Sequence, residues 1–190
     1  MIPITINEKK YMIKSCDELT TKEFFEINKI ENLDLLKYIS WATKEDYSKV
    51  FHARISESVI KQIGSLKDDL PLPKKVIGIP VEINIIDTIG QRFMIETSNK
   101  KESDLLIFVC AVALSKSEDY TVIEQYENRL LNALYTEVIP AAQFFFIHLQ
   151  NGRNLGISSF RKTLLLIKIK ASRYLQGWIS LINTLITLKS

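Results

Sequence analysis

The spacing of hydrophobic residues changes along the first 70 positions. β-forming residues at 4–6 and 11–13, joined by a short polar stretch, predict a β-hairpin. From residue 21 the apolar side chains recur every three or four positions, which predicts one helix to about residue 30 and a second that starts at Asn32 or Asp34. A third helix is expected from Asp46 to a cap at Gly64. This half is therefore predicted to be a hairpin followed by helices.

A second half with a similar order follows a stretch that contains two prolines. Proline does not fit the interior of a helix, so residues 67–75 are expected to separate the halves. Residues 76–87, a turn at Gly90 and residues 92–96 predict a second hairpin. Residues 105–114 are apolar on every side, which is typical of a helix buried in the centre of a domain.

Two more helices are expected before residue 152. An apolar stripe from Val122 to Leu134 indicates the first of them. Pro140 suits the first turn of the other, because the first turn leaves its amide hydrogens unbonded and proline has none. Asn151 and Gly152 are expected to end that helix.

The two halves share a phrase. Residues 34–47 read DLLKYISWATKEDY, residues 104–120 read DLLIFVCAVALSKSEDY, and the two starts lie 70 positions apart. This spacing favours an internal duplication over a solenoid repeat, and a chance match is the alternative. The first copy keeps Lys37, Tyr38 and Ser40 as a polar side. It is therefore expected near the surface, whereas the second copy is expected to be buried.

Together these elements predict a helix-rich α+β fold. The first hairpin-plus-helices half is placed at residues 1–70 and the second at residues 74–152. Residues 153–190 are expected to form a long amphipathic C-terminal helix, because apolar residues follow a 3-4-3-4 spacing from Ile157 to Leu188.

A C-terminal helix of about 30 residues would be roughly 45 Å long, which is more apolar length than a body of this size covers. Three arrangements are open: packing between copies in an oligomer, folding back on the chain's own domain, and contact with a membrane. The residues assigned to a candidate assembly helix are Leu164, Ile167, Ala171, Tyr174, Trp178, Leu181, Leu185 and Leu188.

Charge is distributed unevenly along the chain. Glu137 is the last acidic residue, and residues 138–190 carry seven basic side chains, whereas the whole chain has a net charge of +3. A basic tail after an acidic body predicts an anionic partner: the body of another copy, the phosphates of a nucleic acid or the headgroups of a membrane. The candidate contacts to such a partner are Arg161, Lys162, Lys168, Lys170 and Arg173.

Residue types that commonly carry catalysis stand apart in this sequence. Cys16 and Cys110 lack metal-binding spacing, and His52 and His148 lack neighbouring partners for metal or acid–base chemistry. No phosphate-binding loop, nucleophile elbow or zinc-protease motif is present. We therefore expect a protein that is not an enzyme and that uses no cofactor or metal. The N-terminal residues lack the pattern of a secretion signal, which predicts synthesis in the cytoplasm.

The succession of elements resembles a known group of proteins. A hairpin precedes DELTTKEFFEINKIENLDLLKYISWAT, and a PLPK linker leads to a second hairpin, then DLLIFVCAVAL and LLNALYTEVIPAAQFFFIHL. This pattern is similar to small proteins of tailed bacteriophages, particularly phages of Bacteroidetes hosts, described as tail assembly chaperones or virion-module proteins. The similarity covers residues 3–150, and it transfers no catalytic or ligand-binding residue.

The resemblance implies a non-enzymatic phage protein made in the cytoplasm of a bacterial host. The first hypothesis is a structural or packaged component of the virion, in the tail or portal region or as cargo, whose C-terminal helix mediates assembly. Its partners would be other phage structural proteins or its own copies. A tail assembly chaperone absent from the virion is the second hypothesis, and an ejected membrane-active protein is the third.

Overall fold

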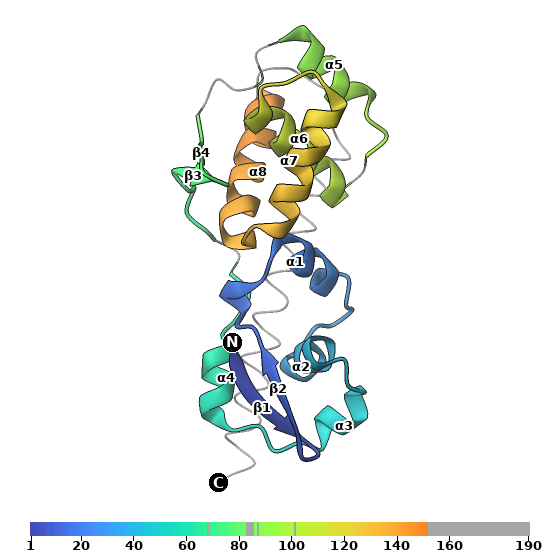
Figure 1. Cartoon of the computed structure of the whole chain (residues 1–190), viewed down its shortest axis with the longest axis vertical. Helices are drawn as coiled ribbons and strands as arrows, with labels where there is room; N and C mark the ends of the chain where they lie inside the picture. Colours follow the sequence, from blue (N-terminus) through green and yellow to red (C-terminus); the bar gives the residue numbers. More distant parts are fainter. Residues whose placement is uncertain (68, 83–85, 87, 101, 152–190) are drawn as a thin grey trace. The chain divides into compact units, whose positions relative to one another are not determined.

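The computed structural model describes residues 1–67, 69–82, 86, 88–100 and 102–151 of the chain. Within these residues the fold is α+β and rich in helix, as the sequence predicts (Figure 1). The described residues form two compact units. We call residues 1–19 with 23–67 the hairpin unit, and residues 20–22 with 69–151 the helical unit.

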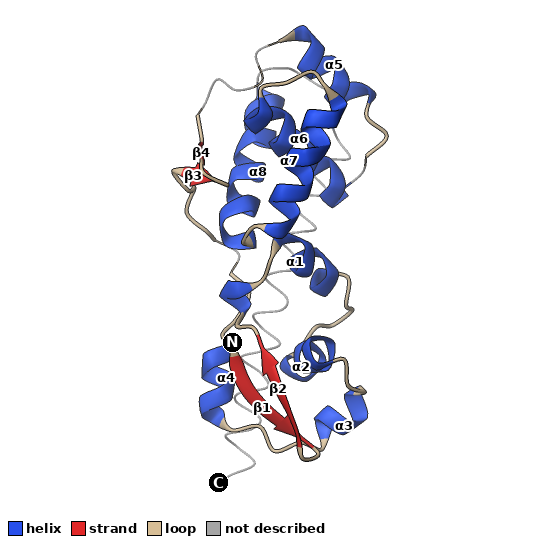
Figure 2. Cartoon of the chain, viewed as in Figure 1, coloured by secondary structure: helices blue, strands red, loops and turns tan. Residues whose placement is uncertain are grey.

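The hairpin unit begins with the predicted β-hairpin. Strand β1 (Ile2–Ile6) pairs antiparallel with β2 (Lys9–Ile13), so the strands are longer and the loop shorter than the sequence suggested (Figure 2). Asn7 and Glu8 form the loop with φ angles of 48° and 68°. Positive φ at both loop residues gives the turn a twist that matches the twist of the paired strands. The inward side chains of β1 are buried in the core of this unit.

Short helices follow the hairpin. Residues 16–18 form one 3-10 turn, and the α-helices are α1 (Thr21–Asn28), α2 (Leu35–Thr43), α3 (Tyr47–Phe51) and α4 (Glu57–Ile63). The single helix expected from Asp46 to Gly64 is wrong, because the chain forms α3 and α4 there. Ser56 starts a new helix by accepting a hydrogen bond from the amide of Val59 at 3.4 Å. Gly64 caps α4 with a φ of 71°, as predicted.

Helix α2 starts after the second of the two predicted residues, and its buried side differs from the predicted one. Asp34 caps it by accepting from the amide of Lys37 at 2.8 Å. Tyr38, which the sequence placed on the polar side, is fully buried. The reason is that its hydroxyl donates to the carbonyl of Lys14 at 2.8 Å, so the ring enters the core without losing its hydrogen bond.

The second hairpin predicted from the sequence is wrong in its position. Strand β3 (Lys75–Val76) pairs with β4 (Ile79–Pro80) around a turn at residues 77–78. Residues 92–96 belong to helix α5 (Ile89–Thr97) and not to a strand. Thr88 and Gln91 cap this helix reciprocally, and its side chains Gln91, Met94 and Ile95 are buried three and four positions apart.

Three longer helices complete the helical unit: α6 (Glu102–Ser115), α7 (Tyr120–Asn132) and α8 (Tyr135–Asn151). Helix α6 packs against both α7 and α8, and its residues 106–114 are all buried, which confirms the predicted central helix. Leu134, expected within a helical stripe, is instead exposed in the turn between α7 and α8.

Pro140 lies in the second turn of α8 and not in its first turn, so that prediction is wrong. A proline at this point removes the hydrogen bond that an amide at 140 would donate to the carbonyl of Thr136. Pro140 is buried, and its neighbours Val138, Ile139, Ala141 and Ala142 are buried as well. Packing of these side chains therefore offsets the missing bond.

Candidate interaction surfaces

The two cysteines lie in the interior of the fold. Cys16 is buried, with its sulfur 3.7 Å from the carbonyl of Gly64, and Cys110 is buried within α6. Burial, and to a lesser degree the neighbouring Asp17 carboxylate, raises the pKa of Cys16 to about 12. Burial also raises the pKa of Cys110. Both thiols therefore stay protonated near neutral pH, which disfavours nucleophilic or metal-binding roles.

The two histidines lie in exposed positions on helices. His52 ends α3 and meets the ring of Phe51 edge-on at 5.4 Å. His148 lies in α8 with its Nδ1 2.9 Å from the carbonyl of Phe144. In the described ranges, no three His, Cys, Asp or Glu side chains lie close enough together to hold a metal ion.

The candidate residues of the C-terminal segment lie outside the described residues. None of the helices in the part of the chain that the structure describes has the length and hydrophobicity that a membrane crossing requires. The candidates outside the described residues are Leu164, Ile167, Ala171, Tyr174, Trp178, Leu181, Leu185, Leu188, Arg161, Lys162, Lys168, Lys170 and Arg173.

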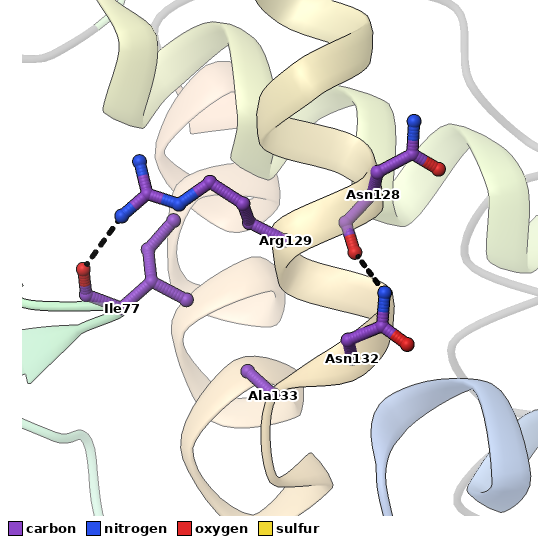
Figure 3. A pocket seen from close by; sticks show the side chains of 5 residues that line it. All are labelled: Ile77, Asn128, Arg129, Asn132 and Ala133. Carbon is purple, nitrogen blue, oxygen red and sulfur yellow. Dashed lines mark hydrogen bonds between the residues drawn. The ribbon is translucent and has the colours of Figure 1, made fainter.

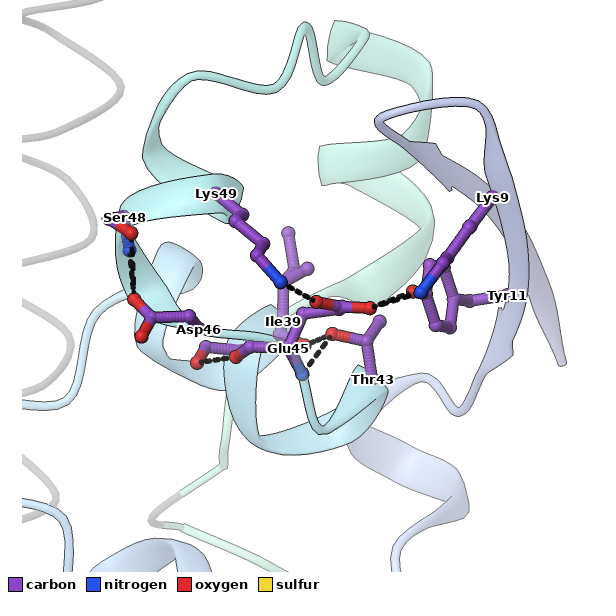
Figure 4. Close-up of polar contacts among 9 residues, drawn as sticks. Lys9, Tyr11, Ile39, Thr43, Glu45, Asp46, Ser48 and Lys49 are labelled. Atoms are coloured by element: carbon purple, nitrogen blue, oxygen red, sulfur yellow. Dashed lines mark hydrogen bonds and ion pairs between the residues drawn. The ribbon is translucent and has the colours of Figure 1, made fainter.

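Glu45 lies at the centre of a polar cluster in the hairpin unit that the sequence did not predict (Figure 4). Its carboxylate accepts a hydrogen bond from Tyr11 and pairs with Lys49 at 3.1 Å and with Lys9 at 3.5 Å. The bond from Tyr11, then the bond and charge of Lys49, lower the pKa of Glu45 to about 2. Only 14% of this side chain is exposed, so the cluster fastens the hairpin to the turn after α2. Its geometry is that of a structural tie.

A surface hollow of about 500 Å³ lies in the helical unit, beside the short hairpin (Figure 3). Arg129 donates to the carbonyl of Ile77 at 3.2 Å, and Asn132 donates to the carbonyl of Asn128 at 2.8 Å. Arg129 also lies over the ring of Tyr126 at 5.3 Å. The bond from Arg129 ties the hairpin turn to α7, whereas the bond from Asn132 lies within α7. The guanidinium of Arg129 has further N–H donors with which the hollow can bind a polar group.

Large apolar side chains are exposed on both units. In the hairpin unit, Phe51 is 59% exposed, and its ring centre lies 6.3 Å from that of Tyr47 with the two rings tilted by 38°. In the helical unit, Ile89 is 87% exposed and Phe93 is 64% exposed. Exposed aromatic and aliphatic side chains of this size are a common feature of protein–protein contact surfaces.

Ile89 and Phe93 form one face of α5, which we call the α5 apolar face. They are four residues apart and so lie one turn apart on the same side of the helix. The start of α5 is held by Glu118, whose carboxylate accepts from the hydroxyl of Thr88. A Cβ added at Gly90 would clash with the carboxylate of Glu118, so the absence of a side chain there permits this close approach.

Sequence reasoning missed this surface because it assigned residues 92–96 to a strand. Phe93, Met94 and Ile95 are consecutive apolar residues, and a short run of that kind is ambiguous between strand and helix. The signal that could have found the helix is the pair Thr88 and Gln91, a threonine followed three positions later by a glutamine.

Neither a protein-family model, nor a curated protein, nor a solved structure matches this chain.

Proposed function

We propose that this chain is a non-enzymatic structural or packaged component of a tailed-phage particle, and that it works by binding other proteins. Such a protein is synthesised in the bacterial host and is then carried in the virion. Its partners are other phage structural proteins or further copies of the chain.

The observation that carries this proposal is the exposure of large apolar side chains on both units. Phe51 in the hairpin unit and Phe93 in the helical unit each expose more than half of their surface. Exposing such side chains to water is unfavourable, and association with another surface removes the cost. The ionisable groups described above hold the chain together: Glu45 ties the hairpin to the helices, and Arg129 ties the short hairpin to α7.

The phage context of the proposal comes from the sequence. Its support is the resemblance of residues 3–150 to small proteins of tailed phages, carried by the order of hairpins and helices and by the short phrases quoted above. The basic, apolar segment at residues 153–190 is the part that we assign to assembly. A cationic helix with two apolar faces suits contact with an acidic protein surface.

Quantitative mass spectrometry of purified phage particles tests this function. Particles of the phage that encodes the chain should contain it at a fixed ratio to the structural proteins through successive purification steps. An abundant host cytoplasmic protein, measured in the same samples, serves as the control for contamination. Abundance that falls in parallel with this control would contradict the proposal and would favour a chaperone that leaves before the particle is complete.

A further inference from the structure

We draw no further inference here: the strongest candidate, the α5 apolar face formed by Ile89 and Phe93 with Arg92 between them in the sequence, carries nothing because nothing in the part of the chain that the structure describes shows what covers it.

Discussion

Helices α2 and α6 carry the same three residues near their N-terminal ends but lie in different environments. Residues 34–36 and 104–106 both read Asp-Leu-Leu. Helix α2 packs on β2 and α3 and keeps Lys37 and Ser40 only half-buried, whereas α6 lies against α5, α7 and α8 and is buried from 106 to 114. The comparison teaches that the number of neighbouring elements, and not the opening phrase, sets how polar such a helix can be.

Exchanging a lysine and an isoleucine at matching positions should give the largest effect. Ile107, which is 2% exposed, corresponds to Lys37 in the shared phrase. Ile107→Lys places an ammonium group in the core without a partner, and we expect a loss of about 3–5 kcal/mol in the free energy of unfolding. The reverse change, Lys37→Ile, removes bonds to the carbonyls of Glu31 and Asn32 and should cost about 1 kcal/mol or less. Urea denaturation followed by circular dichroism measures both, and equal losses would contradict the comparison.

A smaller loss of stability is expected when the cysteine and the serine at another matching position of the shared phrase are exchanged. Cys110 corresponds to Ser40, and it is completely buried. Cys110→Ser buries a hydroxyl in an apolar environment and should cost about 1–3 kcal/mol in the free energy of unfolding. Ser40→Cys loses the 2.6 Å bond to the carbonyl of Glu45 and should cost about 1 kcal/mol. Thermal melts measure the stability of both variants. A larger fall in the melting temperature for Ser40→Cys than for Cys110→Ser would contradict the comparison.

The smallest effect is confined to acid and to the hairpin unit. The pKa of Glu45 is lowered to about 2 in the folded chain, below its value of about 4.3 in an unfolded one. The stability that the charged carboxylate contributes is therefore present above about pH 4.3 and is lost as the pH falls towards 2. In denaturation curves recorded from pH 7 to pH 2, Glu45→Gln should be less stable than the unchanged chain at pH 7. The two should converge at the lowest pH, and a constant difference would argue against this role.

Predictions from the sequence succeeded where neighbouring residues decide the outcome. Asp34 caps α2, Gly64 ends α4 and the first hairpin forms, because each depends on atoms within about four residues or across one tight turn. Buried helix α6 was also predictable, since its run of apolar residues has no side that could face water.

The errors arose where a distant partner decides. Residues 92–96 belong to a helix and not to a strand, because Met94 and Ile95 pack against the helical core and Thr88 caps the start of that helix. Pro140 lies in the second turn of α8, where buried neighbours offset a lost backbone bond. The cluster around Glu45 was not predicted because Tyr11 and Lys9 lie more than 30 positions away in the sequence.

By itself the sequence determined the α+β character, the local starts and ends of several helices, the burial of α6 and the separation of charge between body and tail. Only the tertiary structure decided which side of α2 is buried. Tyr38 lies in the core because its hydroxyl donates a hydrogen bond to the carbonyl of Lys14, 24 residues earlier in the sequence. It also decided that α5 exposes Ile89 and Phe93. The physical reason is that the spacing of apolar residues shows which side of an element is hydrophobic. Whether that side is buried depends on which other elements pack against it.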